Sequence, residues 1–111
     1  MGLLRKLKVN QGLKIKGDNL SISVIVREIS GTRYHKEALL EIRIYKGSKN
    51  QKRIYIGSKD LYLKSSDDFV PIGGKGEVKI AVCPVSRNQR IVKINFHAPR
   101  EQYVFERIAY A

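Results

Sequence analysis

The chain has 111 residues, with 22 Lys and Arg against 10 Asp and Glu and a formal net charge of +12. A chain of this length builds one domain or two very small ones. Its 42% hydrophobic residues are enough for a core and argue against wholesale disorder. Apolar runs such as Val24-Ile25-Val26 are far shorter than the roughly 20 residues that a membrane span needs, so we expect none.

The beginning of the chain interleaves cations with leucines, which gives neither the apolar block nor the cleavage site of a signal peptide. Lys6 stands where a myristoylation pattern needs Ser or Thr. A lone Cys83 makes no intramolecular disulfide, and it lies at no metal-binding spacing from His35 or His97. We therefore expect a protein of the reducing cytoplasm without a cofactor or metal.

Apolar residues alternate with polar ones along most of the chain, which predicts half-buried strands. Leu20, Ile22, Val24 and Val26 share one face of the first clear strand, and the segment from Ala38 to Tyr45 is expected to return beside it as a hairpin. Glycine- and serine-containing turns, Gly57-Ser58 among them, then separate shorter strands. These are expected at residues 52–56, 69–72, 77–83, 90–97 and 102–108.

Turns recur roughly every 8 to 12 residues, which is typical of all-β domains. Parallel strands would need helical crossovers of about a dozen residues, for which the chain has no room. We predict a small antiparallel β-sandwich or barrel with at most one or two short helices. Asp60 to Lys64 fits a strand or one or two helical turns, and Glu101 to Ala111 fits a strand with a short helical end.

The last third of the chain carries a recognisable series of motifs. It contains Ile72-Gly73-Gly74, the strand Glu77 to Val82, the alternating Ile91, Lys93 and Asn95, the turn Ala98-Pro99-Arg100-Glu101 and the closing Glu106-Arg107-Ile108. Over about residues 69–108 this series resembles the carbon storage regulator (Csr/Rsm) family of small RNA-binding translational regulators. The resemblance implies an RNA-binding protein that represses or modulates translation.

The first half resembles the same unit, with Gly17-Asp18 as its turn. Its strands would be residues 3–9, 13–16, 19–29, 38–45 and 53–56, and the second unit would open with a strand at 61–66. We interpret the chain as two pseudo-symmetric copies, 1–59 and 60–111. Family members are homodimers with interleaved strands, so the resemblance implies such a dimer fused into one chain. A unit of roughly 50 residues buries little surface and leaves sheet edges unpaired, which favours this closure.

The resemblance further implies RNA sites at two edges, each built from the first strand of one copy and the fifth strand of the other. One edge would combine Arg5, Lys6 and Lys8 with Arg100 and Arg107, and the other would combine Lys64 with Lys52 and Arg53. Residues 1–56 hold 13 Lys and Arg against 4 acids, whereas residues 57–111 hold 9 against 6. We therefore expect one dominant site, at the first edge. Gly57-Ser58-Lys59 stands where the family carries an Arg, so strict readout of the family's GGA loop is not expected.

Physical chemistry also favours RNA. Cations that neutralise phosphates release condensed counterions, which gives affinity without a sequence match. Tyrosines stack on unpaired bases where they share a face with the cations, and the candidates are Tyr45, Tyr55, Tyr62 and Tyr103. Catalysis is not expected, since no Ser, His and Asp have motif spacing and Gly73 to Gly76 lacks the strand-to-helix context of a phosphate loop.

Two other functions fit the sequence. The first is that of a phage-type inhibitor or decoy that binds an acidic protein partner. Alternatively, the basic hairpin from Arg43 to Arg53 would enter a DNA groove as a β-ribbon. In each case we expect a monomer or a weak dimer.

Overall fold

The computed structural model describes residues 2–32, 34–47, 54–83, 90–99 and 101–109. Nine strands account for most of them, and a short 3-10 turn, η1 (Gly74–Gly76), accompanies them. The strands are β1 (Gly2–Leu7), β2 (Gly12–Gly17), β3 (Leu20–Gly31), β4 (Lys36–Lys46), β5 (Ile54–Lys64), β6 (Val70–Gly73), β7 (Val78–Val82), β8 (Val92–His97) and β9 (Tyr103–Ile108). The prediction of an all-β fold is confirmed. Over these residues no helix has the length and apolarity needed to cross a membrane.

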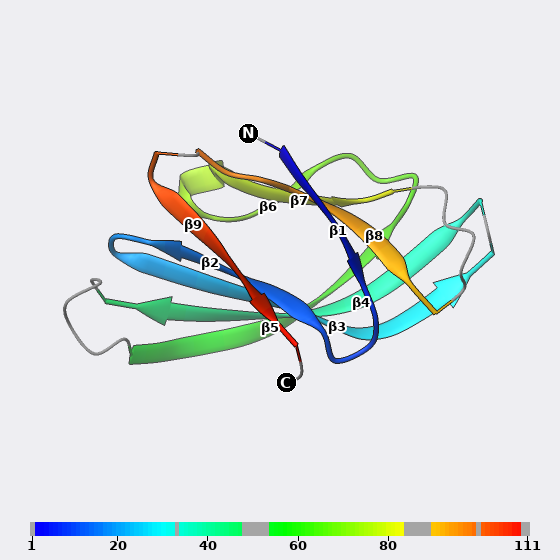
Figure 1. Cartoon of the computed structure of the whole chain (residues 1–111), viewed down its shortest axis with the longest axis horizontal. Helices are drawn as coiled ribbons and strands as arrows, with labels where there is room; N and C mark the ends of the chain where they lie inside the picture. The colour runs from blue at the N-terminus through cyan, green and yellow to red at the C-terminus, as the bar shows by residue number, and fades with distance from the viewer. Residues whose placement is uncertain (1, 33, 48–53, 84–89, 100, 110–111) are drawn as a thin grey trace.

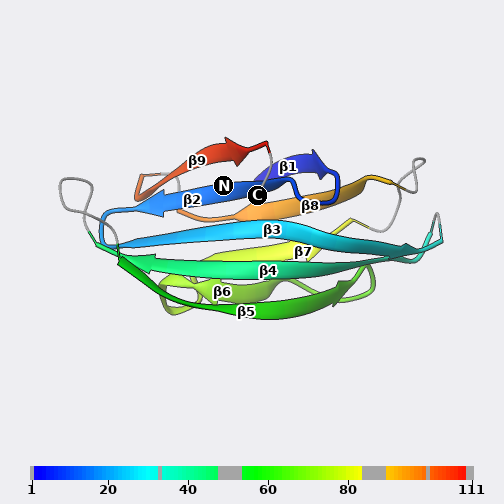
Figure 2. The same ribbon diagram turned by 90° about the horizontal axis from the view of Figure 1, so that it is seen from below.

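The strands form two antiparallel sheets, which we name sheet A and sheet B. Sheet A has the order β1-β8-β7-β6, and sheet B has the order β5-β4-β3-β2-β9. Figures 1 and 2 show the two layers from perpendicular directions. The sheets remain separate, so the fold is a sandwich and not a closed barrel.

One hydrophobic core lies between the sheets. Sheet B contributes the predicted alternating residues of β3 and β4, including Ile22, Val24 and Ile42, and sheet A contributes Ile80 and Phe96, all fully buried. Burial alternates along β4 because successive side chains of a strand point to opposite faces. The prediction that these two strands form a hairpin is confirmed, since β3 pairs with β4 over nearly its whole length.

The predicted turn at Gly57-Ser58 is wrong, because β5 continues through it as one strand of 11 residues. β4 also has 11 residues, and it pairs with β5 from Ile54 to Lys64. Gly57 lies where the register of β5 against β4 shifts, with a φ of 154°. Glycine is common both in turns and in bulges within strands, so the local sequence does not distinguish the two. Asp60 to Lys64, left open between strand and helix, belongs to β5.

The strand orders of the two sheets are related by a simple rule. Four is added to the number of β1 and subtracted from the numbers of β8, β7 and β6. The order β1-β8-β7-β6 of sheet A then becomes β5-β4-β3-β2, which is the order of four strands in sheet B. The fifth strand, β9, joins sheet B beside β2. Applied to the pair β9 and β2, the same rule would place β5 beside β6. Among the described strands β5 is paired with β4 and not with β6. The interpreted copy boundary between residues 59 and 60 falls inside β5.

Candidate nucleic-acid interface

One edge of each sheet lies on the same side of the sandwich. β1 is the edge strand of sheet A, and β9 is the edge strand of sheet B. In Figures 1 and 2 these strands lie on the same side of the molecule and run in the same direction. Each pairs with one neighbour in its sheet, β8 for β1 and β2 for β9. The first and last strands of the chain therefore form a common edge, which we name the β1/β9 edge.

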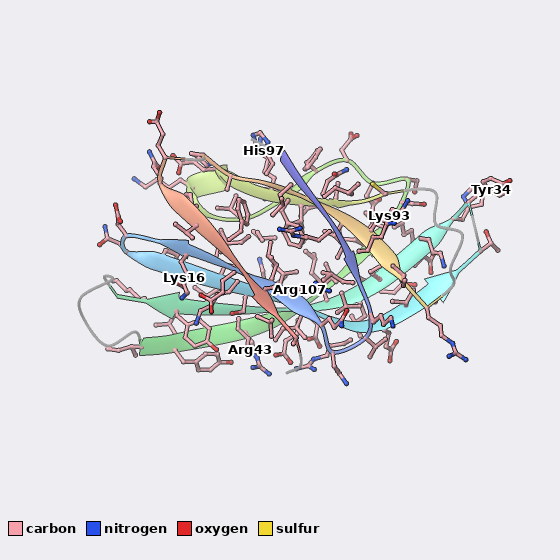
Figure 3. All side chains as sticks on the ribbon, viewed as in Figure 1. Lys16, Tyr34, Arg43, Lys93, His97 and Arg107 are labelled. Carbon is pink, nitrogen blue, oxygen red and sulfur yellow. The ribbon has the colours of Figure 1, made fainter. Side chains whose placement is uncertain are left out.

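Two arginines lie on the inward faces of these edge strands. Arg5 stands opposite the fully buried Ile94, and Arg107 stands opposite Leu13, which is 1% exposed. Residues opposite each other in an antiparallel pair point to the same face of the sheet. Arg5 and Arg107 are nevertheless exposed, because they lie at the open margin of the core. Two cations thus lie at the margin of the core, and Figure 3 shows Arg107 on β9.

The outer face of sheet A is basic. Lys6 on β1 stands directly opposite Lys93 on β8, and Lys79 on β7 stands opposite His97. Figure 3 labels Lys93 and His97 on β8. The sequences of β1, β6, β7 and β8 contain no Asp or Glu. No carboxylate within these strands therefore competes with an incoming phosphate for the lysines.

A groove lies at the end of β1. It encloses about 340 Å³ and is lined by Lys8, Val9, Ile29 and Arg90. Lys8 follows the last residue of β1, and its backbone N–H donates to Gln11 Oε1 at 3.0 Å, which fixes the turn toward β2. The groove combines an apolar floor with cationic groups, a combination suited to a sugar or base with its phosphate.

Four of the predicted site residues lie around the β1/β9 edge, namely Arg5, Lys6, Lys8 and Arg107. Lys64 lies elsewhere. It is the last residue of β5 and stands opposite Glu37. Lys52, Arg53 and Arg100, the other predicted residues, lie outside the described residues.

Lys79, Arg90 and Lys93 are basic residues of this surface that were not predicted from the sequence. Alternation along β8 places Lys93 on an outer face, but no local pattern indicates that this face continues into β1. That pairing joins residues about 90 positions apart. The alternation signal was present for each strand, whereas the order of the strands in the sheet was not encoded locally.

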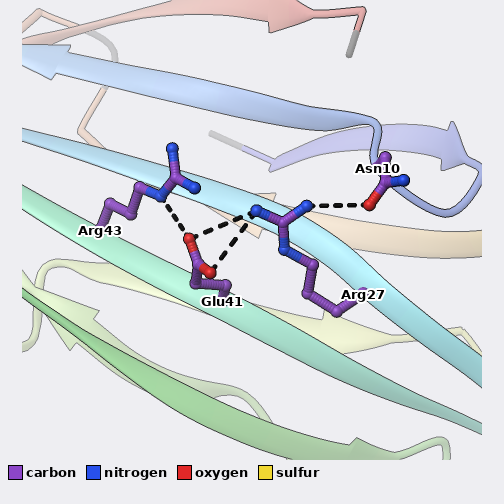
Figure 4. A network of polar contacts seen from close by, with 4 residues as sticks. All are labelled: Asn10, Arg27, Glu41 and Arg43. Atoms are coloured by element: carbon purple, nitrogen blue, oxygen red, sulfur yellow. Dashed lines mark hydrogen bonds and ion pairs between the residues drawn. The ribbon is translucent and has the colours of Figure 1, made fainter. Parts of the chain in front are cut away.

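Three cations of sheet B, Arg27, Arg43 and Lys16, have acidic partners among the described residues. Glu41 on β4 accepts hydrogen bonds from the side chains of Arg43 and Arg27, and Arg27 also donates to Asn10 Oδ1 at 2.8 Å (Figure 4). Partial burial pushes the pKa of Glu41 upward, but the hydrogen bonds and charges of the two arginines outweigh it and lower the pKa. The network ties β3, β4 and the turn after β1 together.

A second ion pair lies at the margin of sheet B. Lys16 on β2 pairs with Glu106 on β9, and its hydrogen bond and charge lower the pKa of that carboxyl. Lys14, the neighbouring outward lysine, instead lies with its Nζ 5.5 Å from the centre of the Tyr45 ring. Figure 3 labels Lys16 and Arg43 on sheet B.

Within the described parts of the chain, no group of three or more His, Cys, Asp or Glu side chains is arranged to hold a metal ion. Cys83 is a free, partly exposed thiol whose Sγ accepts a hydrogen bond from Asn95 Nδ2. Comparisons of the chain with models of protein families, with curated proteins and with solved structures found no match.

Proposed function

We propose that the protein binds single-stranded or hairpin-loop RNA at the β1/β9 edge and regulates translation by occupying its target. The observation that carries this proposal is the placement of Arg5 and Arg107, from opposite ends of the chain, on the inward faces of two edge strands that lie on the same side of the molecule. The acid-free sheet A continues the cationic surface outward from that edge.

Edge strands suit this role because the outer side of each presents main-chain N–H and C=O groups in a regular row. These groups match the hydrogen-bonding edges of unpaired bases, while the flanking cations hold the phosphates. Duplex DNA presents its base edges at the bottom of a groove, which is read by an inserted helix or two-stranded ribbon. The β1/β9 edge has neither, which favours a single-stranded target.

The arrangement of strands also supports an RNA regulator of the Csr/Rsm type. That resemblance implies an RNA edge made of the first strand of one copy and the fifth strand of the other. β1 is the first strand of the interpreted copy 1–59, and β9 is the last strand of the copy 60–111. The rule that relates the strand orders of the two sheets, by a change of four, is what two copies with crosswise pairing would produce.

The proposal also explains why one site would dominate. On the other side of the sandwich β5 would have to serve both as the fifth strand of the first copy and as the first strand of the second. It is paired with β4 throughout, and its last residue, Lys64, stands opposite Glu37. Only the β1/β9 edge joins two separate edge strands that both carry an inward arginine among the described strands.

The test is RNA affinity as a function of salt. We expect selection from a random RNA pool to enrich a single-stranded or loop motif, and that RNA serves as the probe. Arg5→Gln combined with Arg107→Gln should weaken binding and reduce the slope of log affinity against log salt by about 1.4, since each lost phosphate contact on a single strand removes about 0.7. Lys64→Gln is the matched control, because it removes one exposed cation that stands beside an acid.

Three results would contradict the proposal. One is failure of the pool to enrich any RNA. Another is an equal effect of the Lys64 control and the double arginine variant. The third is displacement of the RNA by duplex DNA at equal nucleotide concentration, which would favour a β-ribbon DNA binder.

A further inference from the structure

We propose that bound RNA continues from the β1/β9 edge across the outer face of sheet B and stacks on Tyr45 and Tyr55. This inference rests on the proposed function and adds to it a second contact surface and a minimum target length. The surface lies at the end of sheet B where β2 leads into β3 and where β4 ends and β5 begins.

The two tyrosines stand opposite each other on β4 and β5. Their ring centres are 5.5 Å apart and the rings are tilted by 60°, so they support each other without covering each other's faces. Tyr55 is 53% exposed, although it is an aromatic residue in a strand. An exposed ring held in place by a neighbouring ring is a platform on which a base of any kind can stack.

Cations surround this platform. Lys14 Nζ lies 5.5 Å from the centre of the Tyr45 ring. Arg43 lies two residues before Tyr45 on the same face of β4, where its Nε donates to Glu41 and its other guanidinium nitrogens remain to contact a phosphate. Lys46, the last residue of β4, is exposed but stands opposite Leu20 on the other face of the strand, so it does not belong to the platform. The arrangement thus places phosphate-binding groups beside base-stacking rings, the combination that characterises single-strand binding surfaces.

The opposite end of the same face has the opposite charge. Tyr62 on β5 is another exposed tyrosine, but its hydroxyl donates to Glu37, and Glu28 and Asp60 lie nearby on that face. The hydrogen bond to Glu37 raises the pKa of Tyr62. The face is therefore acidic around Tyr62 and basic around Tyr45. Because the acids repel phosphates, we expect a polyanion to bind at the Tyr45 end and not at the Tyr62 end.

Tyr103 does not belong to the platform. It stands on the inward face of β9, opposite Gly17, and packs against the core, where burial raises its pKa. Among the four tyrosines considered from the sequence, Tyr45 and Tyr55 therefore share a face with the cations. Stacking was expected for tyrosines that share a face with cations, and Tyr45 and Tyr55 do so.

The geometry sets the length of RNA required. Sheet B has the order β5-β4-β3-β2-β9, so four strand spacings separate β9 from β5, or about 19 Å. A short oligonucleotide of about four residues that are all bound at the β1/β9 edge has none left to cross to the tyrosines, whereas one of about 12 residues reaches them, within the range seen for single-strand binding surfaces. Lys14 and Lys16 of β2 lie along the path, between the edge and the platform, and Lys16 is paired there with Glu106 of β9.

The experiment compares these two RNA lengths on three variants. Both oligonucleotides are taken from one selected motif, with the longer one extended by unstructured residues. We expect Tyr45→Leu combined with Tyr55→Leu to weaken the longer RNA at least about tenfold and to leave the shorter RNA unchanged. The Tyr45→Phe, Tyr55→Phe double variant keeps both rings and should bind as the parent does. Tyr62→Leu is the matched control at the acidic end and should change neither affinity.

A second measurement reports stacking directly. The chain has six Tyr and no Trp, so its intrinsic fluorescence comes from tyrosine. The longer RNA should quench this emission more than the shorter one, and the extra quenching should disappear in the leucine double variant. Far-ultraviolet circular dichroism and thermal unfolding establish that the variants are folded.

The outcomes separate the two proposals. If both RNAs bind but the leucine and phenylalanine double variants retain the affinity of the parent for the longer RNA, the second surface is refuted and the edge site stands. Equal weakening by Tyr62→Leu would refute it as well. If neither RNA binds, the proposed function falls and this inference falls with it.

Discussion

Lys6 on β1 and Lys93 on β8 stand directly opposite each other in the register of sheet A. Like charges in opposing positions of an antiparallel pair destabilise it by a few tenths of a kcal/mol to about 1 kcal/mol. The pair therefore costs stability and supplies two adjacent positive charges at the proposed RNA edge.

Lys93→Gln should stabilise the protein by about 0.5 kcal/mol at low salt, because it removes that repulsion. Urea unfolding measures the change, and the gain should vanish near 1 M salt, where screening acts over about 3 Å. The same variant should bind RNA more weakly. Lys79→Gln, which removes a lysine opposite His97, is the control for stability and should give no gain. A destabilised Lys93→Gln protein would contradict the prediction.

Glu41→Gln should lower the free energy of unfolding by about 1 kcal/mol at pH 7, because it breaks the hydrogen-bonded ion pairs with Arg27 and Arg43. The pKa of Glu41 is lowered in the folded protein, so its stabilisation is present above the unfolded carboxyl pKa of about 4.3 and is lost as the pH falls through the lower folded value. Urea unfolding of both proteins should show the difference closing as the pH falls from about 5 to about 3.

A control for this effect is Glu106→Gln. Glu106 also has a lowered pKa through Lys16, but its side chain is 57% exposed. Solvent screens exposed pairs, so its removal should change stability less than the removal of Glu41. A difference between parent and Glu41→Gln that stays constant from pH 7 to pH 3 would show that the carboxylate charge plays no part.

Gly12→Ala should destabilise the protein by about 3 kcal/mol. A Cβ at this buried position on β2 would lie 2.1 Å from the carbonyl oxygen of Val24, so the paired backbones would have to move apart. Gly57→Ala is the comparison, because a Cβ there meets no atom within 4 Å and the cost comes from its φ of 154° alone, roughly 1 kcal/mol. Thermal unfolding of both variants should preserve this order, and the reverse order would show that β2 and β3 lie farther apart than described.

Ser21→Ala should leave the protein as stable as the parent or raise its stability by about 1 kcal/mol. Ser21 Oγ is buried and has no hydrogen-bond partner among the described residues, and a buried hydroxyl without a partner costs free energy. Ser58→Ala, at an exposed position of β5, should be neutral. Chemical unfolding checks both, and a clear loss of stability in Ser21→Ala would indicate that the hydroxyl has a partner, such as a bound water.

The sequence predicted the strands that have one buried and one exposed face. Burial alternates along β4 as predicted, and a period of two fixes which face of such a strand is buried before any partner strand is known. The prediction that β3 is half-buried is wrong, because Ser21, Ser23 and Ile25 between its core residues are buried as well. Gly57 shows the limit of that reasoning. Its local signal is the same for a turn and for a bulge, and the choice is made by β4, whose 11 residues pair with both sides of the glycine.

The candidate site was predicted in the same partial way. Arg5, Lys6, Lys8 and Arg107 were chosen by position within the expected strands, and they lie around one edge. Lys93 and Arg90 join them through pairing and packing between distant parts of the chain, which no local pattern encodes. The interpretation of the chain as two copies stays a prediction, as does the function, which the RNA-binding experiments above address.

The continuity of β5 has a consequence for stoichiometry. A homodimer with two equivalent edges can hold two segments of one transcript and draw them into a loop. In this chain the strand that would complete the second edge runs without a break beside β4. Under the proposed function one molecule therefore engages one segment, and it blocks a transcript locally without bridging distant parts of it.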